Sequence, residues 1–339
     1  MTALRADDVT IRSAAQALAA GRLVAFPTET VYGLGADGLN PTAVQRIFAV
    51  KGRPADHPVI LHVGTVQAAK ALASHWPSMA DQLASAFWPG PLTMILKRAA
   101  CVPDIVTGGQ DTVGLRMPSH PVAMQLLAAF AQVGSGVIAA PSANRFGAVS
   151  PTRAADVAAS IGDRLAVGDV ILDGGDCDVG VESTIIDLSG GQARLLRPGG
   201  ISRHAIEQVL GVKMAESGAN APRVSGSLES HYAPRAKTVL CASSELLSQL
   251  AQLQSDVQTA SARIAALVMS PELIRVLSAR EGVVCMPISI DPQAYAHDLY
   301  ARLNDADRQS AQVLLIEAPP QLPTWEAVND RLRRACAAA

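Results

Sequence analysis

The stretch from residue 23 to residue 63 constrains the fold more than any other part of the chain. It starts with an apolar, β-like run over residues 23–26, which a proline ends. A Thr-Glu-Thr run and a glycine-rich segment, residues 33–38, follow, and we expect a turn at the glycines. Asn40, itself followed by proline, predicts a helix start, and the apolar run 59–63 predicts the next strand. This order favours an α/β fold with ligands at the strand ends.

Three of these glycines, Gly33, Gly35 and Gly38, have the spacing of the dinucleotide-binding fingerprint. That motif places its first glycine directly after a strand and its last one inside the opening helix. Here residues 27–32 separate the strand from the glycines, and the helix begins only after Gly38. We therefore disfavour a nicotinamide or flavin site. A P-loop fold is also disfavoured, because no glycine loop ends in Lys-Ser or Lys-Thr.

The rest of the chain alternates between strand-like and helix-like segments, with one interruption. Residues 213–236 are rich in Ser, Gly, Ala and Pro and have no sustained period, which is typical of a linker. A chain of 339 residues with 49% hydrophobic residues is long enough for two cores. We predict a first domain over residues 1–212, a linker over 213–236, and a smaller Rossmann-like domain over 237–339.

The charge balance argues against a general nucleic-acid-binding surface. The formal net charge is −2, whereas such proteins usually carry a basic surplus. The five cysteines are far apart in the sequence, which disfavours a zinc site and a disulfide framework and fits a reducing cytoplasm. The first ten residues include acids and no apolar core, so we expect no signal peptide. No apolar run reaches the ~18 residues that a membrane span needs.

Cations that follow predicted strands or a predicted helix suggest an anion site. They are Lys51, Arg53, Arg116 and Arg197. A triphosphate carries about four negative charges near neutral pH, and arginine forks match phosphate oxygens in pairs. No Gly-x-Ser-x-Gly elbow occurs, and no cysteine has a credible partner in the sequence. We therefore expect positioning and charge stabilisation instead of covalent catalysis.

Several residues have a structural interpretation beside the functional one. Ser150 suits a helix N-cap, and a helix N-terminus can also bind an anion. His62 fits a hydrogen-bonded histidine inside a strand, and Tyr232 fits an aromatic that packs the linker onto a domain. The three arginines within residues 331–334 are typical of a solvated helix face.

Dispersed motifs give the chain a resemblance to a known family. PTETVYGLG and KGRP come first, followed in order by TVGLRMP, APSANRFGAVSPT, GVESTIIDL, LLRPGG, HYAP and VNDRLRRA. In this order they resemble the Sua5/YrdC/YwlC family of threonylcarbamoyl-AMP synthases, in its longer Sua5 form. The resemblance implies an α/β fold, with a YrdC-like twisted mixed sheet and helices followed by a smaller, Rossmann-like Sua5 domain.

The resemblance also implies an activity. The family forms L-threonylcarbamoyl-AMP and pyrophosphate from L-threonine, bicarbonate and ATP, with Mg²⁺ accompanying ATP. The product then passes to the machinery that makes N6-threonylcarbamoyladenosine in tRNA. Matched by motif, the residues for threonine are Thr30, His62, Arg116 and Ser183. Those around ATP are Lys51, Arg53, His57, Thr112, Ser142, Asn144, Ser150, Arg197, His231 and Tyr232.

Roles within this set differ. Lys51 and Arg53 are the residues to which we assign catalysis, and the linker is a plausible lid. Relatives often carry asparagine where this chain has His57. Two other hypotheses compete: a non-catalytic module that binds double-stranded RNA or tRNA, and a domain that transfers carbamoyl groups to a partner protein. The chain has no acylphosphatase-like or zinc-finger segment, which weakens the latter.

Overall fold

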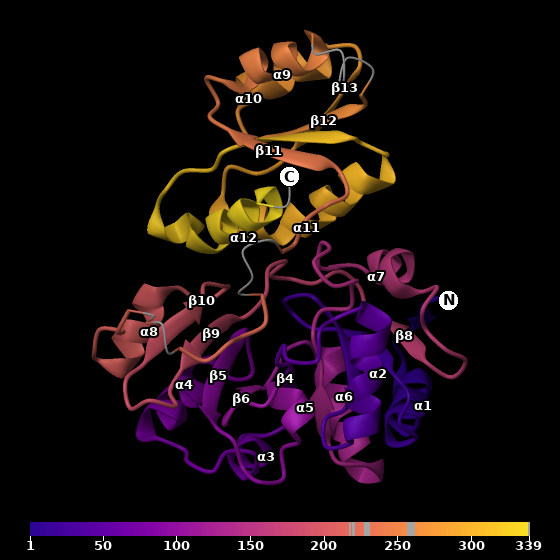
Figure 1. Ribbon diagram of the computed structural model, residues 1–339, viewed down its shortest axis with the longest axis vertical. Coiled ribbons are helices and arrows are strands. Elements are labelled where there is room, and N and C mark those ends of the chain that lie inside the picture. Colours follow the sequence, from indigo (N-terminus) through magenta and orange to yellow (C-terminus); the bar gives the residue numbers. More distant parts are fainter. Residues whose placement is uncertain (217, 219–220, 227–230, 256–261, 338–339) are drawn as a thin grey trace. The chain divides into compact units, whose positions relative to one another are not determined.

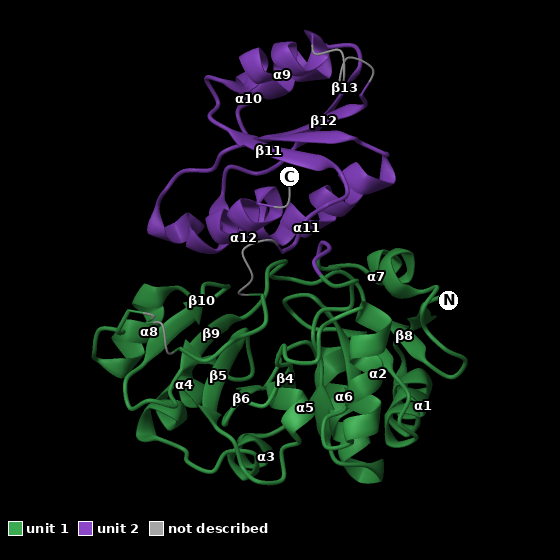
Figure 2. Cartoon of the chain, in the orientation of Figure 1, with its two compact units in different colours: residues 1–146, 150–227 green, residues 147–149, 228–339 purple. Residues whose placement is uncertain are grey.

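The chain forms two compact units (Figures 1 and 2). The computed structural model describes residues 1–216, 218, 221–226, 231–255 and 262–337. Unit 1 comprises residues 1–146 and 150–227, and unit 2 comprises residues 147–149 and 228–339. The boundary between residues 227 and 228 falls inside the predicted linker, residues 213–236, whereas residues 147–149 of unit 2 come from outside it.

Unit 1 is built on a mixed sheet whose ten described strands run in the order β1-β8-β2-β3-β7-β4-β6-β5-β9-β10. These strands are β1 (Leu4–Arg5), β2 (Val24–Pro27), β3 (Tyr32–Asp37), β4 (Ile60–Val63), β5 (Leu92–Lys97), β6 (Thr112–Arg116), β7 (Val137–Ala139), β8 (Val170–Asp173), β9 (Thr184–Asp187) and β10 (Arg194–Arg197). The helices are α1 (Asp8–Ala19), α2 (Pro41–Lys51), α3 (Val66–Ala71), α4 (Ser78–Phe87), α5 (Asp104–Thr107), α6 (Pro121–Val133), α7 (Ala154–Ile161) and α8 (Arg203–Leu210). The predicted α/β class is confirmed.

Alternation along the strands distributes the core over both faces of the sheet. Val24 and Phe26 pack with α1 and α6 on one face. Leu23 and Ala25 belong to the larger cluster on the other face, which includes α2, α4 and α7. Helices α1 and α6 cover the part of the first face formed by β8, β2, β3 and β7. The polar side chains of the site lie on the same face, over the strands beyond β7.

The prediction of a turn at residues 33–38 is wrong for residues 33–37, which belong to strand β3, antiparallel to β2, whereas Gly38 lies in the turn after this strand. The glycines serve close packing. A Cβ on Gly35 would come within 2.8 Å of Ile138 Cγ2 and 2.9 Å of Phe26 Cε1. A Cβ on Gly38 would lie 2.7 Å from a methyl group of Leu61. The turn of this hairpin is formed instead by the Thr-Glu-Thr run, which therefore lies at the ends of two paired strands.

The predicted start of the helix after the glycines is confirmed. The Asn40 side chain accepts hydrogen bonds from the backbone of Thr42 and Ala43, so it caps the start of α2. Gly52 takes the left-handed conformation at the other end, with φ of 66°. This ending leaves Lys51 buried in the last turn of the helix.

Unit 2 contains a parallel sheet of four described strands in the order β11-β14-β12-β13, as expected for a small Rossmann-like layer. Its strands are β11 (Lys237–Cys241), β12 (Ile264–Val268), β13 (Val283–Pro287) and β14 (Val313–Glu317). Its helices are α9 (Leu246–Ser255), α10 (Pro271–Ser278), α11 (Pro292–Arg308) and α12 (Glu326–Cys336), with a 3₁₀ turn at Pro323–Trp325. Among the described helices of the chain, none is long and apolar enough to cross a membrane.

Candidate active site

A row of polar side chains crosses the sheet of unit 1. His62 on β4 pairs in register with Arg116 on β6, and Arg116 pairs with Thr93 on β5, so the three side chains share one face. The hydroxyls of Thr93 and Ser183 lie 2.8 Å apart. Arg197 Nη2 donates to Ser183 Oγ at 3.2 Å. The row therefore joins residues that are far apart in the sequence, and four of its five members were predicted.

The turn of the β2–β3 hairpin meets this row at Arg116. Arg116 Nη2 donates to Thr30 Oγ1 at 2.9 Å, and the Thr30 and Thr28 hydroxyls lie 2.8 Å apart. The same Nη2 lies 2.8 Å from Glu29 Oε1. All four residues are buried. A buried guanidinium among small hydroxyls suits the carboxylate of a small ligand.

Burial and the neighbouring charged side chains set the protonation states of His62 and Glu29. Burial and the neighbouring Arg116 lower the pKa of His62 to about 3, so the imidazole is neutral near pH 7. Burial alone would raise the pKa of Glu29, but the nearby Arg116 and backbone N–H donors such as that of Ser119 together outweigh burial and leave that pKa below its ordinary value. The pocket thus holds one cation, one anion and a neutral imidazole.

Two arginines mark the side of the site that suits phosphate. Arg53 Nη2 donates to Ser225 Oγ at 2.9 Å, and Arg197 Nη1 donates to the Ser225 carbonyl at 2.8 Å. Both guanidinium groups are buried. Ser225 therefore brings together two predicted phosphate ligands that are 144 positions apart (197 − 53).

Lys51 has a structural partner as well as a predicted catalytic role. Its Nζ donates to the carbonyl oxygens of Ser142 and Asn144, each at 2.5 Å. Burial and the nearby Arg53 hold the pKa of this amine well below its usual range. In its protonated form the amine has three donors, so Lys51 can then tie down the 142–144 loop and still offer one donor to a ligand.

The interpretation of Ser150 as a helix N-cap is wrong. Helix α7 begins at Ala154, and its N-cap is Arg153, whose side chain makes no capping bond. Ser150 Oγ instead donates to Glu182 Oε1 at 2.6 Å, and both residues are buried. The hydroxyl is thereby held by the residue that precedes Ser183 in the chain.

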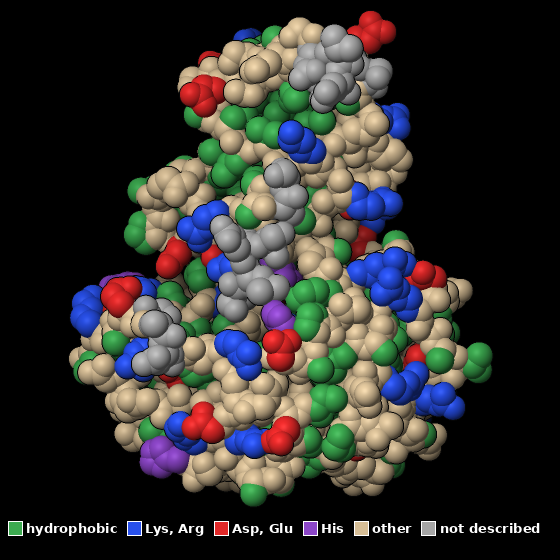
Figure 3. Space-filling model, viewed as in Figure 1, with side chains coloured by type: hydrophobic (Ala, Val, Ile, Leu, Met, Phe, Trp, Pro, Cys, Tyr) green, Lys and Arg blue, Asp and Glu red, His purple; other side chains and the backbone are tan. Residues whose placement is uncertain are grey.

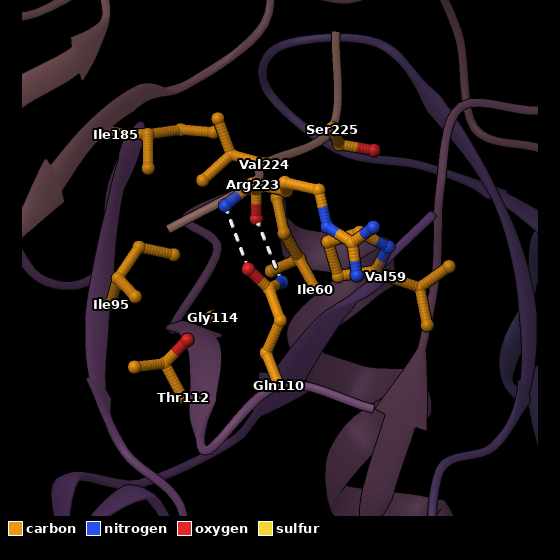
Figure 4. Close-up of a pocket in the computed structure, with 11 residues that line it drawn as sticks. Val59, Ile60, Ile95, Gln110, Thr112, Gly114, Ile185, Arg223, Val224 and Ser225 are labelled. Atoms are coloured by element: carbon orange, nitrogen blue, oxygen red, sulfur yellow. Dashed lines mark hydrogen bonds between the residues drawn. The ribbon is translucent and has the colours of Figure 1, made fainter. Parts of the chain in front are cut away.

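The linker residues before Ser225 lie over the apolar part of this face (Figure 4). Gln110 Nε2 donates to the Arg223 carbonyl at 3.1 Å, and Arg223 N donates to Gln110 Oε1 at 2.7 Å. Val224 packs against Ile95 and Ile185. A cavity of about 20 Å³, room for about one water, remains beside Gly114, and its lining includes the predicted residue Thr112.

His57 lies at the edge of the site, half-buried. Its ring is 5.3 Å from that of Phe146, and its carbonyl accepts from Arg53 Nε at 3.4 Å. Burial and Arg53 lower the pKa of the imidazole. These contacts place it next to the phosphate side, with its backbone carbonyl engaged by Arg53.

His231 and Tyr232 belong to unit 2. The Tyr232 ring stacks on Tyr300 with centroids 5.6 Å apart, and the Arg331 guanidinium lies 5.3 Å above it. Tyr232 is 1% exposed and has φ of 62°. This packing agrees with the structural interpretation of Tyr232, and a role of either residue at ATP stays a prediction.

Five residues of the site had no predicted role: Thr28, Glu29, Thr93, Glu182 and Ser225. Glu29 and Glu182 each precede a predicted threonine-site residue, and that adjacency was the available signal. Thr93 had none, because its place beside Arg116 depends on the pairing of β5 with β6. In the described part of the chain, no group of three or more His, Cys, Asp or Glu side chains could hold a metal ion.

Comparison with known proteins identifies the family. The family model described as "Telomere recombination" (Sua5/yciO/yrdC) matches residues 16–199, and "Threonylcarbamoyl-AMP synthase, C-terminal domain" matches residues 201–337. The chain is 37% identical to the threonylcarbamoyl-AMP synthase of Pyrococcus abyssi, over 98% of this chain and 95% of the relative. The chain belongs to the Sua5 family of threonylcarbamoyl-AMP synthases.

Other Sua5 relatives agree over the whole length. The Bacillus subtilis threonylcarbamoyl-AMP synthase is 37% identical and matches 98% of this chain and 94% of its own. A crystal structure of P. abyssi Sua5 complexed with L-threonine superposes with a TM-score of 0.86 at 35% identity, covering 99% of this chain and 96% of that one. The chain is accordingly an ATP-using threonylcarbamoyl-AMP synthase, a nucleotidyltransferase of tRNA modification, and the predicted family, fold and enzyme class are confirmed.

The hypothesis of a non-catalytic RNA-binding module finds no support in these relatives. The surface seen in Figure 3 agrees with this outcome, because basic and acidic side chains are interspersed on the face shown. Electrostatic RNA binding would be favoured by a continuous basic stripe.

Proposed function

We propose that the enzyme uses L-threonine, bicarbonate and ATP, and that the row from His62 to Arg197 holds them in sequence. Thr30, His62, Arg116 and Ser183 take threonine. The ATP ligands in unit 1 are Lys51, Arg53, His57, Thr112, Ser142, Asn144, Ser150 and Arg197. The roles predicted for His231 and Tyr232 at ATP stay predictions. The observation that carries the proposal is the hydroxyl pair of Thr93 and Ser183, which joins the Arg116 pocket to Arg197.

The reaction follows from this order of groups. The amine of threonine attacks CO₂ derived from bicarbonate, gives up a proton, and becomes an N-carboxylate. An oxygen of that carboxylate attacks the α-phosphorus of ATP, and the bond from this phosphorus to the bridging oxygen of pyrophosphate breaks. Arg53 and Arg197 stabilise the negative charge that the leaving pyrophosphate gains. Lys51 holds the loop of Ser142 and Asn144 at the nucleotide.

Mg²⁺ accompanies the triphosphate in this proposal. Oxygen atoms of the kind that suit a hard cation are those of the Ser150 hydroxyl and the Glu182 carboxylate, which lie 2.6 Å apart. The product carries an activated carbamoyl group that a tRNA-modifying transferase consumes. For the compartment we propose a reducing cytoplasm, with which the scattered free cysteines agree.

The proposed substrates are tested by supplying them one at a time. Purified enzyme with ATP, Mg²⁺ and bicarbonate should release pyrophosphate with L-threonine and not with L-valine, which replaces the hydroxyl by a methyl group. Removal of bicarbonate and dissolved CO₂ should stop the release. Equal release with valine, or release without bicarbonate, would contradict the proposed substrates.

The segment Arg223–Ser225 is proposed to act as the lid predicted from the linker. Val224→Asp places a carboxylate among Ile95 and Ile185, so this segment should leave the sheet and expose the N-carboxy intermediate to water. We expect turnover to fall by about tenfold or more while ATP still binds. Val212→Asp, at an exposed position after α8, is the matched control and should keep normal turnover. Normal pyrophosphate release by Val224→Asp would show that the segment is no lid.

A further inference from the structure

The Arg116 pocket contains a buried carboxylate whose role in the reaction is not assigned. Glu29 lies in the turn between β2 and β3 and is 4% exposed. Its backbone carbonyl accepts from Val179 N at 2.7 Å, and its Oε2 accepts from Ser119 N at 3.1 Å. Glu29 is thus fixed both at its backbone and at Oε2, and its Oε1 is directed at Arg116.

Three buried polar atoms of this pocket make no hydrogen bond within the described part of the chain. They are Glu29 Oε1, Arg116 Nε and His62 Nδ1. Oε1 lies at 2.8 Å from Arg116 Nη2, but without the alignment of a hydrogen bond. Buried polar atoms of native proteins are almost always satisfied, so an ion pair with unused capacity on both partners indicates a ligand. One unused atom is an anionic acceptor and another is a cationic donor.

We propose that Glu29 receives the α-ammonium group of the amino-acid substrate while Arg116 receives its α-carboxylate. This inference rests on the proposed function, because it assumes that threonine occupies the pocket. The ligand class is then an L-α-amino acid in its zwitterionic form. Carboxylate and ammonium of one amino acid are separated by a single carbon, which matches two opposite side-chain charges in direct contact.

The neutral imidazole of His62 is consistent with this arrangement. A charged imidazolium in the row beside Arg116 would repel the ammonium group, whereas neutral His62 offers either a donor or an acceptor. The Thr30 hydroxyl, which accepts from Arg116, keeps the guanidinium oriented toward the hairpin turn.

A simpler role for Glu29 is to orient Arg116 without touching the substrate. Ligands that lack one charge separate the two roles. (R)-3-hydroxybutyrate is threonine without its ammonium, and L-threoninol is threonine with an alcohol in place of the carboxylate. The Kd of each, and of L-threonine, is measured by calorimetry on the full-length wild-type enzyme and on Glu29→Gln, which preserves the side-chain shape.

Direct contact predicts a specific pattern. Glu29→Gln should weaken the binding of L-threonine about 100-fold and that of L-threoninol by a similar factor. The binding of (R)-3-hydroxybutyrate should be unchanged or tighter. Equal weakening of threonine binding and hydroxybutyrate binding, with threoninol binding unaffected, would overturn the proposal and leave Glu29 as a positioning residue. Unchanged threonine binding would overturn it too.

Controls separate this inference from the proposed function. Wild-type enzyme that neither binds threonine nor releases pyrophosphate with it contradicts the proposed function itself. Wild-type turnover together with the second pattern contradicts only the role of Glu29. Affinity for ATP and the unfolding midpoint should stay near wild type in Glu29→Gln. Should Glu29→Gln fail to fold, Glu29→Asp retains the charge at a shorter reach and should weaken threonine and threoninol more than hydroxybutyrate.

Discussion

Alanine in place of Arg53 should lower threonine-dependent pyrophosphate release by about 10²–10³-fold. Arg53 is buried beside Ser225, through which it is joined to Arg197, and its guanidinium is one of two that face the proposed phosphate side. Loss of a fixed positive charge acts most where negative charge develops, which is on the leaving pyrophosphate. The effect should therefore appear mainly in kcat, measured by continuous detection of pyrophosphate at saturating substrates.

Two further variants make the Arg53 result interpretable. Arg53→Lys keeps the charge but loses the fork, so it should recover only part of the activity. Arg145→Ala is the matched control, since Arg145 follows Asn144 but pairs with Asp163 at 2.7 Å and is 44% exposed. It should retain near wild-type turnover. Wild-type kcat in Arg53→Ala, with folding verified by circular dichroism, would remove Arg53 from the chemistry.

Lys51 is a less informative position for the same test. Its ammonium binds the carbonyls of Ser142 and Asn144, so Lys51→Ala removes a charge and also releases a loop. A loss of activity in that variant would not separate the two causes. The sequence assigns catalysis to both Lys51 and Arg53, whereas the structure gives Lys51 an additional structural role.

Residues at motif positions were predictable, while those that depend on strand pairing were not. His62, Arg116, Ser183 and Arg197 were predicted, and the structure brings them into one row. Thr93 escaped prediction, because a lone threonine in an apolar strand gives no signal until β5 is known to pair with β6. Pairing between distant strands is a property of the tertiary fold and leaves little trace in local sequence.

Local rules failed where packing decided the outcome. Glycines predict turns through their backbone freedom, but Gly35 is selected by the side chains of Ile138 and Phe26 that press against it. Ser150 has the chemistry of an N-cap, yet its hydroxyl is held by Glu182, which comes from a distant segment. In both cases a partner remote in the sequence overrides the local preference.

The burial of an arginine near the C-terminus also differs from the sequence-based expectation. A solvated helix face was expected for residues 331–334, but the Arg331 side chain is fully buried in unit 2. Arg331 Nη1 lies 2.7 Å from Asp330 Oδ2, and Arg334 Nη2 lies 3.1 Å from Asp330 Oδ1. Burial alone would raise the pKa of Asp330, but Arg331 and Arg334 hold it below its ordinary value. Asp330 is therefore an ionised carboxylate that compensates a buried cation.

Asp330→Ala should consequently destabilise unit 2 by about 3–5 kcal/mol, because it removes a buried counter-charge of Arg331. Hydrogen exchange followed by mass spectrometry measures this unit directly. Peptides from β14 and α12 should lose protection by about two to three and a half orders of magnitude, since each 1.4 kcal/mol is tenfold. Peptides from β4 and β6 in unit 1 serve as the internal reference.

Arg333→Ala is the matched control for this charge cluster. Arg333 binds the same carboxylate, with Nη2 3.0 Å from Oδ1, but its side chain is 74% exposed. Water can replace an exposed partner, so this variant should cost no more than about 1 kcal/mol. Equal losses of protection in Asp330→Ala and Arg333→Ala would mean that the burial of Arg331 does not increase the stabilisation that Asp330 provides. A much larger loss in Asp330→Ala would identify the carboxylate as the element that lets unit 2 keep an arginine in its interior beside Tyr232.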